Sequence, residues 1–247
     1  MSTKEISVVI IAKNAQQTIG RTLDALNRFA EVILYLNDST DDTEKIARRY
    51  HNVKIIKGVF KGFGPTKNLA ASHASHPWIL SLDSDEILPE ALVDEIDTID
   101  LGDTHTLYQL HRDNYFLGYK TQNSDTIIRI YHKAYTRFND NRVHEKIIVP
   151  PDARIESLKT HFIHLNITDI NQTLTKIIHY TDLGAEGKQT CFFGTVIAKA
   201  MFAFFKTYIL QGNIIRGWVG FALAINSANK RYYKYLKQYI HCKKEEK

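Results

Sequence analysis

Two aspartates one residue apart, Asp83 and Asp85, directly follow the apolar run Trp78–Leu82. Carboxylates with this spacing at a strand end can converge on one hard divalent cation, because such cations prefer oxygen ligands. A cation held there can bridge the phosphates of a nucleotide diphosphate and neutralise charge on a departing diphosphate. The alternative is a solvated acidic turn that caps the next helix. The neighbouring segments decide between these two interpretations.

Three further segments carry polar groups where other strands are expected to end. One is a glycine-rich stretch, residues 62–64, followed by Lys67 and Asn68 in the first turn of an expected helix. Backbone N–H groups at a helix start, with an ammonium beside them, attract phosphate oxygens. The others are residues 12–14 and the turn around Asp38, which offers acceptors for a base or ribose. Ligands of open α/β sheets bind beyond the carboxyl ends of the strands. The segments therefore predict a nucleotide diphosphate site made of Ala12, Lys13, Asn14, Asp38, Lys67, Asn68, Asp83 and Ser84.

A hydroxyl group that displaces a diphosphate requires a side chain that accepts the hydroxyl proton during attack. Glu145 is the preferred candidate, because it falls in the region expected to build the acceptor side. Asp140 and Asp113 are the rival carboxylates. An ordinary surface ion pair with a neighbouring basic residue is the structural alternative for Glu145, and the sequence favours neither interpretation.

Basic and imidazole side chains around this carboxylate are candidates for acceptor or phosphate contacts. We assign Arg129, Arg142 and His144 to that role, although each arginine could equally be a solvated surface residue. His161 and His164 have metal-compatible spacing. An isolated histidine pair in a strand-like segment is more often structural, so the predicted metal ligands are Asp83 and Asp85, with His164 as a less favoured third ligand.

Alternating apolar runs and amphipathic stretches supply the elements that would position these residues. Strands are expected at Ile6–Ile11, Val32–Leu36, Val53–Ile56 and Trp78–Leu82, and helices at Thr18–Arg28, Thr43–Tyr50 and from Pro65. Continuous apolar strands that alternate with helices are typical of an α/β protein with a mostly parallel, Rossmann-like sheet and helices on both faces. A small mixed-strand region on the acceptor side is expected from Thr106–Leu110, Ile127–Tyr131 and Lys146–Val149.

Length and composition fit one α/β domain with an appendage. The chain has 247 residues, of which 44% are hydrophobic and 24% charged, which are ordinary values for a globular protein. We expect a catalytic domain over residues 1–168 and a helical region over residues 169–247. The two cysteines have no CxxC spacing, so neither a disulfide framework nor a zinc site is expected, and the usage fits a reducing cytosol. The first residues lack the basic start and long apolar stretch of a signal peptide.

The C-terminal region combines an apolar, aromatic segment with a basic tail. Lys199, Lys206 and Arg216 interrupt the segment, so we expect no run of the roughly 18–20 apolar residues that a spanning helix needs. Residues 230–247 hold seven Lys or Arg and two Glu, interleaved with tyrosines. Basic and tyrosine side chains favour an anionic membrane surface. The region therefore predicts a cytoplasmic protein attached peripherally to the inner membrane. Nucleic acid is the less favoured partner, because no recognised nucleic-acid module accompanies the charge.

Four motifs in chain order, ISVVIIAKN, DSTDDT, KGFGPTKNLAAS and WILSLDSDE, resemble those of glycosyltransferase family 2, which has the GT-A fold. The resemblance continues through NYFLGY, RIY and RFNDNRVHEK and covers nearly the whole chain. It is strongest to the lipopolysaccharide core branch, which includes inner-core heptose β-1,4-glucosyltransferases. The resemblance implies an inverting transfer of a hexose, with glucose expected, from a UDP-sugar with Mg²⁺ or Mn²⁺ to a lipopolysaccharide inner-core acceptor.

The chain departs from the family pattern at the second strand end. The family has an aspartate, a variable residue and a glycine before Ser-Thr-Asp, where this chain has Leu36-Asn37-Asp38. Asp38 would have to take over the base or ribose contact from a shifted position. Two alternatives stay open: a membrane-associated sugar-nucleotide-binding protein without turnover, and a transferase for another glycolipid or polysaccharide. A dehydrogenase is disfavoured, because no GxGxxG follows the first strand.

Overall fold

The structure is a computed structural model that describes residues 1–245, without the side chains of residues 122, 123, 166, 172 and 179. Glu246 and Lys247 of the basic tail lie outside the described residues. The chain forms two compact units, and each is described by itself. The first comprises Met1–Asn114 and Asn123–Asn166, and the second comprises Tyr115–Gln122 and Ile167–Lys247.

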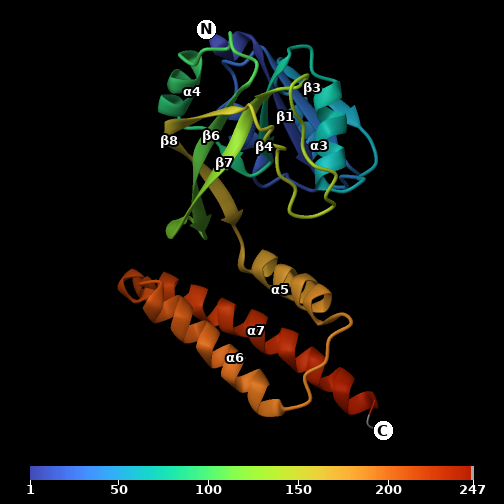
Figure 1. The fold of residues 1–247 in the computed structure, drawn as a ribbon, viewed down its shortest axis with the longest axis vertical. Coiled ribbons are helices and arrows are strands. Elements are labelled where there is room, and N and C mark those ends of the chain that lie inside the picture. Colours follow the sequence, from blue (N-terminus) through green and yellow to red (C-terminus); the bar gives the residue numbers. More distant parts are fainter. Residues whose placement is uncertain (246–247) are drawn as a thin grey trace. The chain divides into compact units, whose positions relative to one another are not determined.

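Four parallel strands form the first half of the sheet in the first unit (Figure 1). They are β1 (Ile6–Ala12), β2 (Glu31–Leu36), β3 (Val53–Lys57) and β4 (Trp78–Asp83), in the order β3-β2-β1-β4. The predicted strands are confirmed, each within one residue. Ala12 pairs with Leu36, and Ile11 pairs with Asp83. This register brings the carboxyl ends of β1, β2 and β4 to one edge of the sheet.

The helices of this half are short. They are α1 (Ile19–Asp24), α2 (Thr43–Ala47), α3 (Phe63–Ser72) and α4 (Glu90–Asp97). The predicted helix over residues 18–28 is too long, since α1 ends at Asp24 and the chain continues in turns. Leu26 and Phe29 in those turns are still fully buried, so the apolar periodicity reflects core packing as well as helix. Helix α3 begins two residues before Pro65, which places the proline in its first turn.

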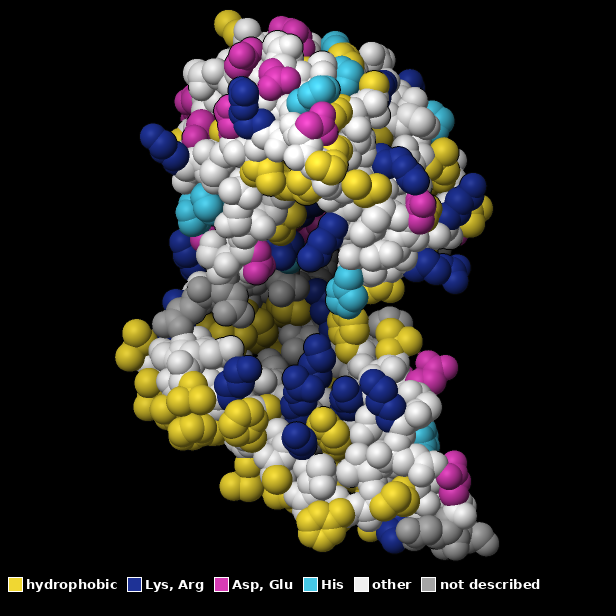
Figure 2. Space-filling view, in the orientation of Figure 1, with side chains coloured by type: hydrophobic (Ala, Val, Ile, Leu, Met, Phe, Trp, Pro, Cys, Tyr) yellow, Lys and Arg dark blue, Asp and Glu magenta, His cyan; other side chains and the backbone are white. Residues whose placement is uncertain are grey.

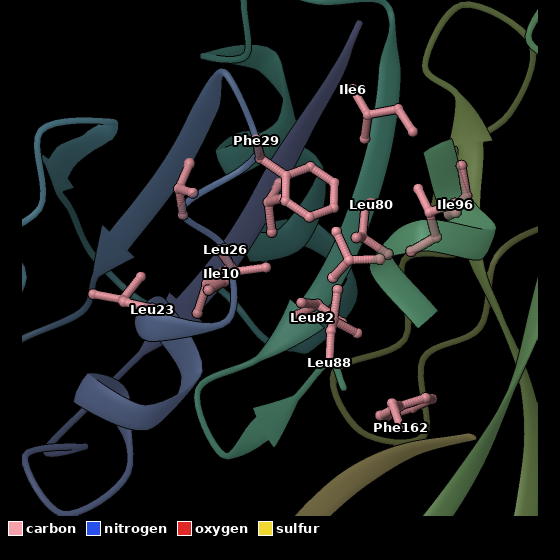
Figure 3. Packing of buried hydrophobic residues seen from close by; sticks show 14 of the residues in the cluster. Ile6, Ile10, Leu23, Leu26, Phe29, Leu80, Leu82, Leu88, Ile96 and Phe162 are labelled. Carbon is pink, nitrogen blue, oxygen red and sulfur yellow. The ribbon is translucent and has the colours of Figure 1, made fainter. Parts of the chain in front are cut away.

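The core of the first unit lies between the parallel strands and the helices. All seven residues of β1 are buried. Figure 3 shows Ile10, Leu80 and Leu82 packed together with side chains from outside the sheet, including Phe29 and Ile96. Full burial of such side chains contributes about 1.5–3 kcal/mol each. The strand ends that carry the polar residues are therefore held in place by a well-packed core.

Four more strands extend the sheet beyond β4, and antiparallel pairing joins β7 to β4 and β5 to β8. They are β5 (Glu86–Ile87), β6 (Thr106–Phe116), β7 (Tyr119–His132) and β8 (Arg154–Ile167), in the order β4-β7-β6-β8-β5. The predicted strands at 106–110 and 127–131 are confirmed as parts of β6 and β7. The predicted strand at 146–149 is wrong. Only one isolated bridge, Phe138 to Ile147, forms there, because this segment is one side of a loop with a single buried anchor at Ile147.

The second unit is helical, with α5 (Ile170–Ala185), α6 (Phe193–Phe205), the short helices η2 (Lys206–Leu210) and η3 (Asn213–Arg216), and α7 (Gly217–Glu245). The Asp169 carboxylate caps α5 by accepting from the backbone N–H of Asn171. The tip of the β6–β7 hairpin belongs to this unit. Phe116 packs there with Ile167 and Val219, and the Tyr119 ring meets Trp218 edge to face.

Two expectations for the C-terminal region are corrected. Cys191 and Cys242 form a disulfide, although 51 positions separate them, because the segment before α6 folds back onto the end of α7. In addition, α6 continues into η2, so Phe193–Leu210 forms one segment that is long and apolar enough to cross a membrane by length and composition alone. Lys199 and Lys206 lie within it and do not shorten it below that length.

Candidate active site

The Lys67 ammonium joins two carboxylates that lie 62 positions apart in sequence. Its Nζ is 2.9 Å from Oδ1 of Asp83 and 2.9 Å from Oε1 of Glu145. The lysine side chain is buried, with 3% exposed, and its Nζ also lies over the Phe138 ring. The structure therefore brings together the first aspartate of the DxD motif and the proposed base. The ammonium already contacts two carboxylates, whereas the sequence predicts an ammonium that is free to bind phosphate.

Arg129 holds the other side of the same aspartate. Its guanidinium donates to Oδ2 of Asp83 at 3.1 Å and forms a buried ion pair with Glu86. Glu86, which is fully buried, also accepts from the backbone N–H of Asp83 at 2.9 Å. Asp83 thus has one oxygen on each of two buried cations. Arg129 is part of the buried framework of the site, where the sequence suggested an acceptor or phosphate contact.

The charges in this cluster shift one another's titration. Burial raises the pKa of Asp83, but the Lys67 ammonium and the Arg129 guanidinium outweigh it and hold that pKa well below the usual range. Burial raises the pKa of Glu86 above its ordinary value, despite the adjacent Arg129. Burial lowers the pKa of Lys67, but Asp83 outweighs this effect and the net shift is upward. Asp83 and Lys67 are consequently charged at neutral pH.

Backbone contacts with the start of α3 hold the loop that carries Glu145. The N–H of Phe63 donates to the carbonyl of Arg142 at 3.1 Å, and the N–H of Gly64 donates to the carbonyl of Asn141 at 3.2 Å. The Asn68 amide both donates to and accepts from the Phe138 backbone at 2.9 Å. Asn68, predicted to bind the nucleotide sugar, is therefore used to position this loop.

Gly64→Ala is expected to lower turnover about 100-fold, since a misplacement of about 1 Å can have that effect. A Cβ at position 64 would lie 2.0 Å from the carbonyl oxygen of Asn139, so the loop that carries Glu145 must move. Initial-rate kinetics would measure the loss. Gly20→Ala is the matched control, because its Cβ meets Ile46 at an ordinary 3.6 Å. Equal rates for both variants would contradict a positioning role for this contact.

The ends of β1 and β2 form the other part of the edge. Asn14 and Asp38 both adopt positive φ, 51° and 55°, and the Asn14 side chain accepts from the N–H of Thr40 at 2.8 Å. The carbonyl of Ala12 accepts from the N–H of Asn37. Lys13 and Asp38 are exposed at this rim. Strained backbone at two adjacent strand ends is typical of a ligand-binding edge.

Three remaining predicted residues lie at the periphery of the site. Arg142 and His144 are exposed in the loop before Glu145, and His144 has a φ of 61°. Ser84 lies in the DxD turn, where its carbonyl accepts from the Thr22 hydroxyl at 3.1 Å. None of these three side chains forms an ion pair with the Lys67–Asp83–Arg129 cluster, so their assigned roles stay predictions.

Asp85 and His164 are the pair best placed to hold a divalent cation. His164 Nε2 is 3.5 Å from Oδ2 of Asp85, and β8 pairs His164 with Glu86 beside it. Among the side chains that the structure describes, no group of three His, Cys, Asp or Glu residues could hold a metal ion. Mg²⁺ and related ions are usually held by one or two protein ligands together with substrate phosphates, so two ligands suit such a site.

Sequence reasoning missed the framework around this site. It assigned no role to Glu86 and disfavoured His164. Glu86 directly follows the DxD motif, and this position was the available signal, because a third carboxylate there can pair with a buried arginine. For His164 no local signal was sufficient, because its partner Asp85 lies in a distant turn.

Comparisons with known proteins point to glycosyltransferases. The family model described as Glycosyl transferase family 2 matches residues 7–155, well over half of the chain. An uncharacterized glycosyltransferase of Rickettsia typhi is 27% identical over 95% of this chain and 86% of its own length. The lipopolysaccharide core biosynthesis glycosyltransferase LpsC of Rhizobium meliloti is 23% identical over 90% of this chain and 87% of its own length.

Solved structures with similar folds include S. aureus TarS, with a TM-score of 0.48 and 15% identity over 98% of this chain and 53% of TarS. Another is glucosyl-3-phosphoglycerate synthase from Mycobacterium tuberculosis in complex with Mn²⁺, UDP and phosphoglyceric acid. It has a TM-score of 0.34 and 26% identity over 47% of this chain and 44% of that protein.

Proposed function

The chain belongs to glycosyltransferase family 2, and we propose that it transfers a hexose, with glucose expected, from a UDP-sugar to a lipopolysaccharide inner-core acceptor. As a member of this family it has the GT-A class of α/β fold. The similarity to LpsC over nearly the full length supports a lipopolysaccharide acceptor. The choice of glucose and of heptose rests on the motif resemblance described above.

One observation carries the catalytic part of the proposal. A single buried ammonium contacts both the DxD aspartate and Glu145, so the proposed base lies one side chain away from the proposed diphosphate site. A surface ion pair, the structural alternative for Glu145, would place its partner in solvent. Here the partner is buried, and Glu145 itself is only 16% exposed.

The proposed chemistry assigns one role to each group. Glu145 accepts the proton of the acceptor hydroxyl while that oxygen attacks the anomeric carbon from the face opposite the diphosphate, which inverts the configuration. Lys67 and Arg129 fix the Asp83 carboxylate and add positive charge near the departing diphosphate. The rim of Ala12, Lys13, Asn14 and Asp38 would contact the nucleoside, and Ser84 the donor sugar. Arg142 and His144, exposed beside Glu145, are available to the acceptor.

Asp85 and His164 would hold Mg²⁺ or Mn²⁺, with Asp83 beside them, and the bound ion would stabilise negative charge on the diphosphate. Asp83 was predicted as an equal ligand. Because both of its oxygens already contact buried cations, we now propose that it mainly orders Lys67 and Arg129.

A mass measurement on the acceptor tests the function. The purified protein would be incubated with UDP-glucose or UDP-galactose, Mg²⁺ or Mn²⁺, and lipopolysaccharide truncated in the inner core. We expect a gain of one hexose that disappears when a chelator is added. Binding of UDP-sugar without any gain, across a panel of glycolipid acceptors, would favour a sugar-nucleotide-binding protein without turnover. A gain only with another glycolipid would reassign the acceptor.

We also propose that the second unit attaches the enzyme to the cytoplasmic face of the inner membrane. Figure 2 shows hydrophobic side chains gathered over α6 and its connection to α7, with Lys and Arg side chains next to them. On α6 and η2 an exposed apolar row recurs every four residues: Phe193, Ile197, Met201, Phe205 and Ile209. Lys199 and Lys206 lie roughly 150° around the helix from the middle of this row, at about 100° per residue. This arrangement favours a helix that lies in the interface.

Met201→Ser with Phe205→Ser is expected to weaken binding to vesicles of anionic phospholipid at least about 10-fold, because two exposed apolar side chains would no longer enter the bilayer. Vesicle flotation measures the bound fraction. Phe60→Ser, which removes an equally exposed aromatic ring from the first unit, is the control. Undiminished flotation of the double variant would contradict attachment through this row.

A further inference from the structure

A chain of polar contacts links two consecutive residues of the acidic turn, Asp85 and Glu86, through three strands of the second half of the sheet. His164 Nδ1 is 2.7 Å from Oδ1 of Asn114, and Nδ2 of Asn114 donates to Asp125 at 3.1 Å. Arg112 donates to the same Asp125 oxygen at 2.8 Å, and its other terminal nitrogen lies 3.5 Å from Glu86. These side chains come from β6, β7 and β8, and all belong to the first unit.

The donors and acceptors along this chain fix the direction of each hydrogen bond. The hydrogen bond from Arg112 lowers the pKa of Asp125, so its carboxylate is ionised and can only accept. The amide nitrogen of Asn114 must therefore face Asp125, which turns the amide oxygen toward His164. An amide oxygen only accepts, so Nδ1 of His164 carries the hydrogen.

In the neutral ring, this assignment leaves Nε2 without a hydrogen. In a neutral imidazole with Nδ1 protonated, Nε2 carries a lone pair. That lone pair faces a carboxylate oxygen of Asp85 at 3.5 Å. Two acceptors that face each other repel unless a cation or a proton lies between them. The neutral form is the one in which a histidine binds a metal ion.

We propose that Asp125 is a positioning residue, which acts through Asn114 to hold His164 as the Nδ1–H tautomer with Nε2 directed at Asp85. The inference rests on the proposed function, because the proposed divalent cation is what this tautomer of His164 would bind. Polar partners that orient a metal-binding histidine typically change metal affinity 10–100-fold when they are removed. Asp125 is half exposed, and its hydrogen-bonded connection to His164 runs through Asn114.

Nitrogen-15 NMR of the histidine rings in the full-length protein, without metal, tests the tautomer directly. The chain has 11 histidines, and the spectrum of His164→Gln would identify the His164 signals by their loss. We expect a protonated Nδ1 and an unprotonated Nε2 in the wild type near pH 7.5. Asp125→Leu, which removes the acceptor but keeps a similar volume, should give a mixture of both tautomers. Asn114→Leu should do the same.

Binding of Mn²⁺ in the presence of UDP, followed by electron paramagnetic resonance, is the second measurement. Asp125→Leu is expected to weaken Mn²⁺ binding about 10–100-fold. Asp152→Leu is the control, because Asp152 is also an exposed aspartate beside a histidine, His105, and lies outside this chain of contacts. Melting temperatures would verify that each variant is folded. The wild-type NMR spectrum tests the tautomer without relying on any variant.

The outcomes separate the two proposals. A protonated Nε2 on His164 in the wild type, or the wild-type tautomer and Mn²⁺ affinity in Asp125→Leu, would overturn the positioning role of Asp125. Failure of the wild type to bind Mn²⁺ with UDP present would instead overturn the proposed cofactor.

Discussion

Glu145→Gln is expected to lower the turnover number about 10²–10⁴-fold, the usual effect of losing a general base. Glutamine keeps the shape of the side chain and can still accept a hydrogen bond from Lys67, but it cannot take up the hydroxyl proton. The contact between Lys67 and position 145 should survive, so the loop should keep its place. Affinity for UDP-sugar should change little, since the proposed donor contacts lie on Asp83, Ser84 and the ends of β1 and β2.

Steady-state rates with saturating donor and acceptor, together with calorimetric binding of UDP, would separate these effects. Glu156→Gln, an exposed glutamate on β8, is the matched control and should retain full activity. Asp140 and Asp113 are already paired, with Arg137 at 2.7 Å and His161 at 2.9 Å. If Glu145→Gln remained active while Asp140→Asn or Asp113→Asn lost turnover, the base would have to be reassigned.

Asp83→Asn and Asp85→Asn are expected to differ in stability although both impair transfer. Asp83 contacts two buried cations, so neutralising it leaves Lys67 and Arg129 each short of one charged partner. Loss of such a buried partner lowers the free energy of unfolding by about 1–3 kcal/mol. For a chain of this length that corresponds to a fall in melting temperature of roughly 3–10 °C. Asp85, whose partly exposed carboxylate faces His164, should change stability by less than about 0.5 kcal/mol.

Turnover should fall about 10²–10³-fold in Asp85→Asn, because stabilisation of the diphosphate by the bound ion is lost. Thermal unfolding without metal and initial rates with Mn²⁺ would be measured on both variants. Each aspartate variant is the control for the other. Equal melting temperatures would contradict the division of roles between Asp83 and Asp85.

The parallel half of the fold was predictable from the sequence, because β1, β2 and β4 are buried on both faces and therefore read as continuous apolar runs. The same regularity placed the polar residues of four segments at the carboxyl edge of one sheet. The remaining half of the sheet was harder to predict. Strand β8 mixes polar and apolar residues, and the apolar segment at 146–149 is a loop with one buried anchor, Ile147.

The sequence by itself determined the α/β class, the DxD motif and the candidate base, since these depend on residue types and local spacing. Only the tertiary structure decided how the charges are partnered. Lys67 was expected to face phosphate but is buried between Asp83 and Glu145, and the disulfide joins cysteines 51 positions apart. The role of His164 depends on Asn114 and Asp125, which come from other strands. Local sequence patterns record which face of an element is buried, whereas ion pairs and tautomers depend on the register between segments distant in the chain.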